Sequence, residues 1–225
     1  MSRFQHLFYG FIRLLLSGGI RLLWRARIKG AERIPATGAF VLAPSHRSMF
    51  DIFVLACPTR RRLRFMGKRQ LFEIPVLGSL FSLLGGFPVD REGADRTALR
   101  TAMSMLEAGE PVVMYPEGTR GHGPQLGEMH DGASYLAAKA GVPILPVGIG
   151  GTEEILPTGK VLPRLHRIAV VVGEPLPPPP RGNAVKRSDV SKLTDSLRDE
   201  LQAVFSESLA RAGVESQPRN AADAA

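Results

Sequence analysis

Short apolar runs alternate with segments of helical spacing along most of the chain. Runs with the length and composition of buried strands occupy residues 39–43, 62–66, 87–89, 111–115, 142–147 and 168–172. Between them, apolar residues three or four positions apart predict helices over residues 51–57, 71–84, 94–108 and 131–140. Strands that alternate with helices are typical of an α/β domain. We therefore predict a mixed, largely parallel sheet flanked by helices over residues 31–176.

The pattern changes after this domain. Four consecutive prolines, Pro177 to Pro180, form a stiff, extended run, and we expect a proline-rich linker over residues 177–187. Apolar residues then recur at helical spacing, which predicts a C-terminal amphipathic helix over residues 188–212 that packs back on the domain. Residues 213–225 are expected to form a frayed, disordered tail.

The N-terminal residues 1–30 combine large apolar side chains with six basic residues and no acidic one. Arg13 and Arg21 interrupt the apolar stretch, which stays below the ~18 residues that a spanning helix needs. Residues 24–27 make a poor cleavage site, which argues against a signal peptide. Ser17-Gly18-Gly19 predicts a break between two helices that lie in a bilayer interface, with their cations toward lipid headgroups. The alternative is a terminal helix that packs on the protein's own core.

Composition narrows the possible classes of protein. The chain has 225 residues, of which 44% are hydrophobic and 22% charged, so it is neither a disordered chain nor a polytopic membrane protein. Lys and Arg number 29 against 21 acidic residues, and the net charge of +8 admits nucleic acid, an anionic membrane or a phosphorylated small molecule. The one cysteine, Cys57, lies in an apolar run, which predicts a core thiol and excludes an intrachain disulfide or a zinc site built on thiolates.

The segment from Pro44 to Asp51, which follows the first predicted strand, contains a histidine and an aspartate five residues apart. On one continuous helix these side chains would lie ~140° apart, so a contact requires the chain to bend first. The turn-prone Ser45 and Ser48 allow that bend. A carboxylate bonded to one nitrogen of His46 would leave the other nitrogen to act as a general base. A loop histidine beside a helix-capping Asp51 is also a common structural arrangement.

A second segment, Tyr115-Pro116-Glu117-Gly118-Thr119-Arg120, directly follows a predicted strand, where loops of open α/β sheets line the ligand crevice. Gly118 permits close backbone approach, Thr119 offers a hydroxyl, and Arg120 offers a bidentate fork for phosphate. The alternative is a surface turn with a local pair between Glu117 and Arg120.

Two further cations are candidates for the same site. Arg91 ends the segment Gly86-Phe87-Pro88-Val89-Asp90-Arg91, which is extended up to its last residues. Lys68 lies just ahead of a predicted helix, whose N-terminus also favours anions.

The four motifs together resemble the lysophospholipid, or 1-acylglycerol-3-phosphate, acyltransferase family. His46 and Asp51 match its His-four residues-Asp motif, residues 86–91 its second motif, and Pro116 to Arg120 its Pro-Glu-Gly-Thr-Arg motif. Val142 to Val147 matches its Val-Pro-Ile-x-Pro-Val motif, and the order agrees over residues 30–175. The chain departs from the pattern at Met129-His130-Asp131, where relatives often carry Phe-Lys, which puts the acceptor preference in doubt.

The resemblance implies acyl transfer from acyl-CoA or acyl carrier protein to the free hydroxyl of a lysophospholipid, above all 1-acyl-sn-glycerol-3-phosphate. It implies that His46 is the general base and that Asp51 orients it. Residues implied in binding the acceptor and its phosphate are Lys68, Arg91, Glu117, Gly118, Thr119 and Arg120. An oxyanion hole is expected from backbone N–H groups near His46 or in residues 117–119. No metal or bound cofactor is implied, and the expected place is the cytoplasmic face of the cell membrane, in peripheral association with lipid.

Several other functions are alternatives. A different lysolipid, such as lyso-ornithine lipid, or glycerol-3-phosphate would fit the same motifs. A serine hydrolase would need a Gly-x-Ser-x-Gly elbow, which the sequence lacks, and a metal hydrolase would need clustered histidines, whereas the five here are scattered. A membrane- or nucleic-acid-binding module could use the basic run at residues 60–64, which could also contact a carrier protein. We expect no nucleic-acid partner.

Overall fold

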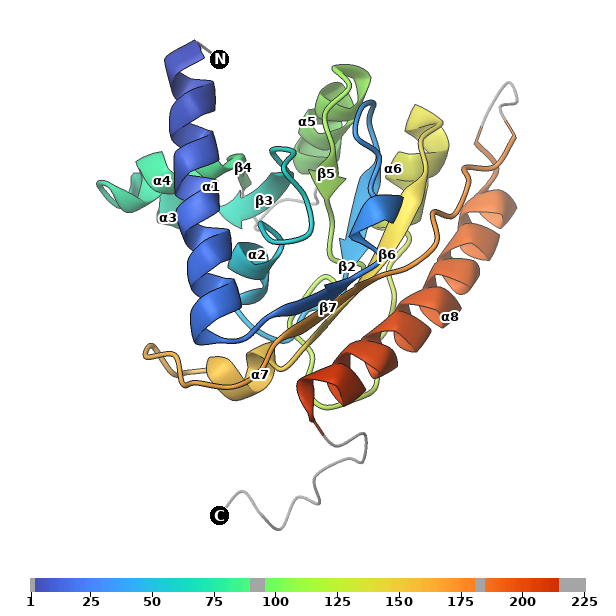
Figure 1. The fold of residues 1–225 in the computed structure, drawn as a ribbon. Helices are drawn as coiled ribbons and strands as arrows, with labels where there is room; N and C mark the ends of the chain where they lie inside the picture. Colours follow the sequence, from blue (N-terminus) through green and yellow to red (C-terminus); the bar gives the residue numbers. More distant parts are fainter. Residues whose placement is uncertain (1–2, 90–95, 181–184, 215–225) are drawn as a thin grey trace.

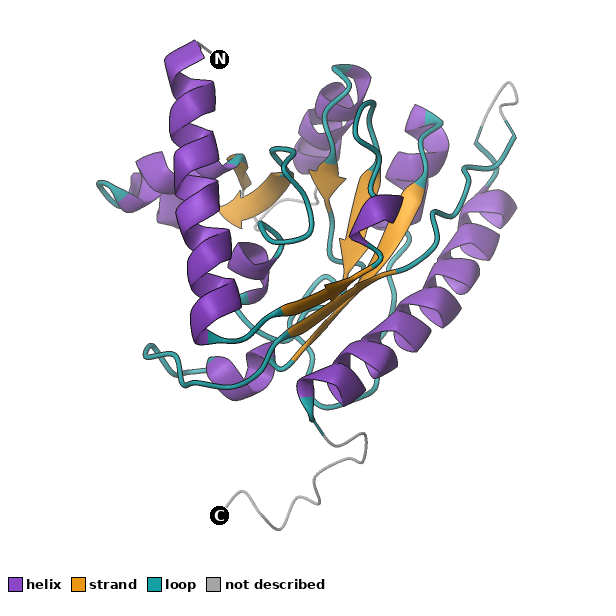
Figure 2. Cartoon of the chain, viewed as in Figure 1, coloured by secondary structure: helices purple, strands orange, loops and turns teal. Residues whose placement is uncertain are grey.

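A computed structural model describes residues 3–89, 96–180 and 185–214. Its described strands form one seven-stranded sheet in the order β1-β7-β6-β2-β5-β3-β4, with helices on both faces (Figures 1 and 2). The strands are β1 (Arg27–Lys29), β2 (Val41–Pro44), β3 (Arg64–Lys68), β4 (Gly86–Val89), β5 (Val112–Val113), β6 (Ile144–Gly150) and β7 (Ala169–Val172). Neighbouring strands are parallel except β6 and β7, which confirms the predicted mixed, largely parallel sheet.

The described helices follow the predicted order but differ from it in number and extent. They are α1 (Arg3–Leu23), the 3-10 helix η1 (Ala31–Arg33), α2 (Asp51–Val54), α3 (Arg69–Glu73), α4 (Leu77–Leu84), α5 (Arg96–Glu107), α6 (Gly132–Ala140), α7 (Thr152–Ile155) and α8 (Arg187–Ala212). The single helix predicted over residues 71–84 is two helices, because the chain breaks at Ile74-Pro75-Val76 and Val76 takes a φ of 68°. Neither α7 nor β1 was predicted, since elements of three or four residues are too short to show a period.

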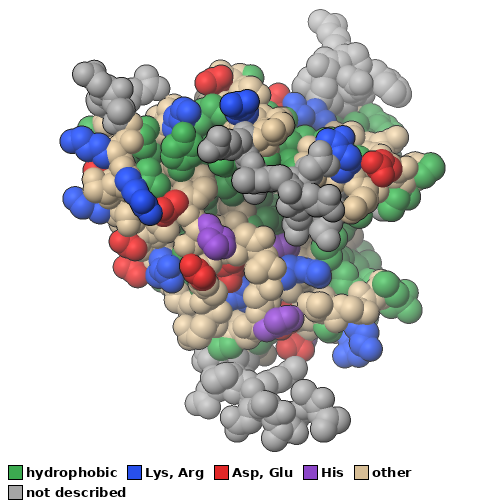
Figure 3. All heavy atoms as spheres, turned by 180° about the vertical axis from the view of Figure 1, so that it is seen from behind, with side chains coloured by type: hydrophobic (Ala, Val, Ile, Leu, Met, Phe, Trp, Pro, Cys, Tyr) green, Lys and Arg blue, Asp and Glu red, His purple; other side chains and the backbone are tan. Residues whose placement is uncertain are grey.

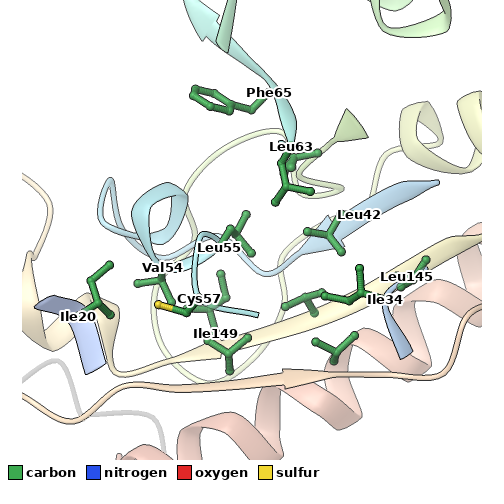
Figure 4. Close-up of a cluster of buried hydrophobic side chains, with 14 of the residues drawn as sticks. Ile20, Ile34, Leu42, Val54, Leu55, Cys57, Leu63, Phe65, Leu145 and Ile149 are labelled. Carbon is green, nitrogen blue, oxygen red and sulfur yellow. The ribbon is translucent and has the colours of Figure 1, made fainter. Parts of the chain in front are cut away.

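Alternation of side chains along the strands divides the core into two layers. Leu42 of β2 points into a cluster with residues of α1, α2 and α4, whereas its neighbours Val41 and Ala43 face a cluster with α5, α6 and α8. Figure 4 shows the first layer, where Ile20 of α1 and residues next to α2 lie over Leu42 and Ile149 of the sheet. Helices on both faces therefore follow from strands that are apolar on both sides.

Helix α8 lies along β6 and β7 and belongs to the same core as the sheet (Figure 1). Leu197 and Leu201 of α8 are fully buried, as the predicted amphipathic helix requires. The helix backbone also approaches β6 closely. A Cβ atom at Gly148 would lie 2.2 Å from the carbonyl oxygen of Val204, so this crossing requires glycine.

Helix α1 is continuous, and the predicted break at residues 17–19 is wrong. Ser17 is buried and its hydroxyl donates to the carbonyl of Leu14, so the helical turn there is kept. Ile20 packs in the core, as the alternative of a helix on the protein's own body requires.

Arg13 and Arg21 of α1 point toward the protein. The Arg13 guanidinium donates to the carbonyls of Ala56 and Thr59, at 3.0 and 3.1 Å, and Arg21 donates to the carbonyl of Cys57 at 3.1 Å. These carbonyls follow α2, where unpaired helix-end acceptors attract cations. The expectation that the cations of this segment face lipid headgroups is therefore wrong for Arg13 and Arg21.

The opposite side of α1 is apolar and exposed. Its exposed residues include Leu7, Phe11, Leu14 and Leu22, which share one helix face at 100° per residue. None of the described helices has both the length and the apolar character needed to cross a bilayer.

Leu197→Ala is expected to lower the free energy of unfolding by about 2–5 kcal/mol, because it empties a fully buried site between α8 and the sheet. Leu22→Ala, on the exposed face of α1, is the matched control and should change it by less than about 0.5 kcal/mol. Urea unfolding of both variants measures the difference. Equal stabilities would contradict the inclusion of α8 in the core.

Candidate active site

His46 and Asp51 form a hydrogen-bonded pair at the end of β2. His46 lies in the loop after the strand, and Asp51, the first residue of α2, is fully buried. The His46 Nδ1 atom lies 2.8 Å from Asp51 Oδ2, which also accepts the backbone N–H groups of Arg47 and Ser48 at 2.8 and 2.9 Å. The predicted bend is therefore present, and the carboxylate that contacts the imidazole also holds the bend.

The imidazole of His46 stacks on the ring of Tyr115, with 3.9 Å between centroids and 24° between planes. Burial, and secondarily the charge of Asp51, raises the pKa of the Tyr115 phenol well above its usual value, so this ring stays neutral. The His46 side chain keeps 18% of its surface exposed. Because Nδ1 is engaged by Asp51, the other nitrogen, Nε2, is the one a substrate can use.

A buried ion pair lies beside this histidine. The Arg47 Nη1 atom is 3.0 and 2.9 Å from the two carboxylate oxygens of Glu117, and both side chains are only 2% exposed. Arg47 also donates to the carbonyls of Gly123 and Gln125, and its guanidinium lies 4.6 Å from the centre of the Phe205 ring in α8. Each polar atom of this arginine is thus compensated within the protein.

The ion pair fixes the backbone of His46 on both sides. Glu117 Oε1 accepts the N–H of His46 at 3.1 Å, and Arg47 Nη1 donates to the carbonyl of His46 at 2.8 Å. The N–H of Gly121 donates to the same carbonyl at 2.9 Å. A Cβ atom at Gly121 would lie 2.6 Å from Arg47 Nη1, so glycine is needed there. Sequence reasoning did not identify Arg47, because no periodicity marks an arginine whose partner lies 70 residues away.

The residues predicted to bind the acceptor lie in different surroundings in the structure. Thr119 and Gly118 are exposed in the loop after β5, and Arg120 makes no hydrogen bond or ion pair with the described part of the chain, so its guanidinium is accessible to an anion. Glu117 lies in the same loop, but its oxygens are engaged by Arg47 and by the N–H groups of His46 and Gly127. Its contact with an acceptor stays a prediction.

Lys68 ends β3, where its Cα pairs with that of Val89 in β4, but its side chain is not among those described. Arg91 lies outside the described residues. Strands β2, β5, β3 and β4 are adjacent and parallel, so their carboxyl ends share one edge of the sheet. The topology therefore brings His46, the loop of residues 117–120 and Lys68 to that edge.

His130 stands where the chain departs from the motif pattern, and it contacts the same loop. Its N–H donates to the carbonyl of Pro116 at 2.9 Å. A Cβ atom at Gly118 would lie 2.9 Å from Cδ2 of the His130 ring. The imidazole of His130 therefore lies directly against Gly118.

The backbone donors near His46 are already used. The N–H groups of His46, Arg47 and Ser48 all donate to carboxylates, and that of Gly118 donates to the carbonyl of Tyr115. Of the two places expected for an oxyanion hole, this disfavours the loop of His46. It leaves the N–H groups of Glu117 and Thr119.

Comparison with known proteins shows the family of the chain. Residues 25–150, more than half of the chain, match the family model described as Acyltransferase. The chain belongs to the acyltransferase family. The matched region contains all four motifs and both loops of the site.

Named relatives within the acyltransferase family include a chloroplastic 1-acyl-sn-glycerol-3-phosphate acyltransferase of Brassica napus, 34% identical over 71% of this chain and 47% of the relative. A 1-acyl-sn-glycerol-3-phosphate acyltransferase of Bacillus subtilis is 26% identical over 84% of this chain and 89% of the relative. The chain thus spans about half the length of the plant relatives it matches.

The crystal structure of the 1-acyl-sn-glycerophosphate acyltransferase PlsC of Thermotoga maritima has the same fold. Its TM-score is 0.68 at 24% identity, covering 88% of this chain and 85% of that one.

Glu117→Gln keeps the shape of the side chain but leaves the Arg47 charge buried without its partner. We expect the free energy of unfolding to fall by about 3–5 kcal/mol. In an acyltransferase assay kcat should fall while the KM for the acceptor stays unchanged, because the variant disturbs His46 and not a substrate contact. Steady-state kinetics and urea unfolding measure both effects.

Glu207→Gln, which removes solvent-accessible ion pairs with Lys29 and Arg211, is the control and should lower the free energy of unfolding by no more than about 1 kcal/mol. A raised acceptor KM with normal kcat and stability in Glu117→Gln would instead identify Glu117 as an acceptor contact.

Proposed function

We propose that this acyltransferase moves a fatty acyl group from acyl-CoA or acyl carrier protein to the free hydroxyl of a lysophospholipid. The leading acceptor is 1-acyl-sn-glycerol-3-phosphate, which would give phosphatidic acid. The observation that carries the proposal is the 2.8 Å contact between His46 and Asp51, beside the loop that presents Arg120. The activity named for the relatives supports the choice of reaction and acceptor.

In the proposed mechanism, Nε2 of His46 takes the proton of the acceptor hydroxyl as its oxygen attacks the thioester carbonyl. Asp51, bonded to Nδ1, holds the ring and stabilises the imidazolium that forms. The N–H of Thr119 is our candidate donor to the oxyanion. Collapse of the tetrahedral intermediate breaks the C–S bond, and the leaving thiolate takes the proton back from His46. The ester product forms without a covalent enzyme intermediate.

The phosphate of the acceptor is assigned to the cations at the shared edge of the sheet. Arg120 offers two parallel N–H donors to phosphate oxygens, which Lys cannot do. Lys68 and Arg91 complete the proposed set, since parallel β3 and β4 end at the same edge as β5.

The acyl chain is assigned to an apolar cavity between α1, α2, β3 and α4. Its lining includes Leu16, Ile52, Phe53, Leu63, Phe65 and Phe81. Ile52 and Phe53 directly follow Asp51 in α2, so one wall of the cavity is the helix that begins at the proposed catalytic pair. Burial of methylene groups there would contribute about 0.8 kcal/mol each.

A peripheral membrane location at the cytoplasmic face completes the proposal. The exposed apolar face of α1 would lie in the bilayer interface, where both the acceptor and the product reside. Acyl-CoA and acyl carrier protein are water-soluble thioesters that would approach from the cytoplasmic side.

The basic run at residues 60–64 gives little support to the alternative of a membrane- or nucleic-acid-binding module. Arg61 donates to the carbonyl of Gly109, and Arg64 is paired with Glu110, whose pKa its hydrogen bond lowers. Burial lowers the pKa of Arg61 and Arg62, so neither is a fully solvated cation. On the face opposite the view of Figure 1, the described Lys and Arg side chains are scattered among acidic ones and do not gather in one patch (Figure 3).

His46→Ala is expected to reduce kcat by about 10²–10⁴-fold, because it removes the proposed general base. The assay uses purified protein with acyl-CoA and a panel of lyso-acceptors, with products identified by mass. His122→Ala, which changes an exposed histidine outside the pair, is the control. Full turnover by His46→Ala would refute the mechanism.

Arg120→Ala is expected to raise the KM for the phosphorylated acceptor by about tenfold to a hundredfold. This corresponds to the loss of one or two hydrogen bonds to a charged group. The KM for acyl-CoA and the stability should change little. Arg100→Ala, on the exposed side of α5, is the matched loss of one positive charge. An unchanged acceptor KM would remove Arg120 from the phosphate site.

A further inference from the structure

The segment between α7 and β7 carries three large apolar side chains in solvent. Val161, Leu162 and Leu165 are 88%, 79% and 76% exposed, and we call residues 157–167 the apolar loop. Single exposed apolar residues are ordinary, but a cluster at the tip of one loop marks an interaction surface.

Cations flank these side chains. Lys160, Arg164 and Arg167 are exposed, and none forms an ion pair with the described residues. The apolar loop contains no acidic residue, so it carries three positive charges with histidine neutral. Apolar tips among unpaired cations are complementary to a leaflet with anionic headgroups above hydrocarbon.

The apolar loop lies at the C-terminal end of α1 (Figure 1). The indole N–H of Trp24 donates to the carbonyl of Arg164 at 2.8 Å, and the N–H of Ile168 donates to the carbonyl of Trp24 at 3.1 Å. Leu22 and Leu23, which end α1 just before Trp24, are also exposed. Exposed apolar residues of the helix and of the loop therefore lie at the same end of α1.

The same surface reaches the loop of His46. The hydroxyl of Ser48 donates to the carbonyl of Leu156, immediately before the apolar loop, at 2.8 Å. The ring of Trp24 lies 4.9 Å from that of Phe50, and the side chain of Met49 beside it is exposed. Contact of the apolar loop with a membrane would thus place the His46 loop near the lipid surface.

We propose that the apolar loop is a second membrane-contacting element, which inserts into an anionic bilayer interface beside the end of α1. Contacts by both the apolar loop and α1 fix the orientation of the domain, so that a lysophospholipid can reach His46 without leaving the leaflet. The choice of acceptor rests on the proposed function, whereas the lipid contact does not.

A fluorescent label tests insertion directly. Cys57, the one native cysteine, is buried, so Leu162→Cys can be labelled at a defined place with an environment-sensitive fluorophore such as NBD. We expect a blue shift and brighter emission with vesicles of phosphatidylcholine and phosphatidylglycerol, and a smaller change with phosphatidylcholine alone. Val185→Cys, an exposed position two residues before α8, is the labelled control and should not respond, since the N-terminal end of α8 lies across the domain from α7 (Figure 1).

Sedimentation with the same vesicles measures how much the apolar loop contributes to membrane binding. Val161→Ser/Leu162→Ser/Leu165→Ser should partition about tenfold more weakly than the unchanged protein. Its turnover of a short-chain, water-soluble lysophosphatidate should be unchanged, because the loop supplies no catalytic group. Val185→Ser is the matched control for loss of an exposed apolar side chain.

The outcomes separate this inference from the proposed function. An unshifted label with normal acyl transfer would overturn the membrane contact and leave the function intact. Lipid-dependent insertion without acyl transfer to any acceptor would support the membrane contact and refute the proposed function. A label shift that grows with protein concentration in the absence of vesicles would show a protein interface and overturn the proposal.

Discussion

Arg47 and Glu117 place two opposite charges at nearly complete burial, where the loops after β2 and β5 meet. Such a pair is stable only when every remaining polar atom is also satisfied, because the desolvation of two ions costs several kcal/mol for each. Here the additional partners are backbone groups of His46, Gly123, Gln125 and Gly127. The geometry of the proposed general base therefore depends on charges that never contact its ring.

The helix α8 takes part in this arrangement although it lies beyond the residues that the family model matches. Phe205 of α8 stacks under Arg47, and the side chain of Gln202 bonds to both Pro124 and Leu126 of the loop after β5. The sheet supplies the residues of the site, and the C-terminal helix holds one of its loops in place. The catalytic unit is therefore larger than the region defined by its motifs.

Sequence reasoning was most successful where the signal is local. Apolar runs identified six of the seven described strands, and the spacing of His46 and Asp51 required a bend that the structure contains. It failed at Ser17-Gly18-Gly19, where a hydroxyl bond back to Leu14 and burial against the body outweigh weak helix propensity. It also missed Arg47, whose role depends on two loops and a distant helix meeting at one point. The apolar loop was overlooked because short apolar groups between prolines and cations show no period.

Helix α1 is fixed in rotation as well as in position. Arg13 and Arg21 bind carbonyls after α2, and the hydroxyl of Tyr9 donates to the carbonyl of Arg61 at 3.2 Å, so contacts on one side span several turns. A helix held in this way cannot roll about its own axis to suit a surface. A flat surface that binds the outward side of α1 must therefore orient the whole domain. The bound domain can then only rotate about the surface normal and move within the plane of the surface. Once the domain is bound in this way, it encounters other molecules in that surface by diffusion within a plane instead of through three dimensions.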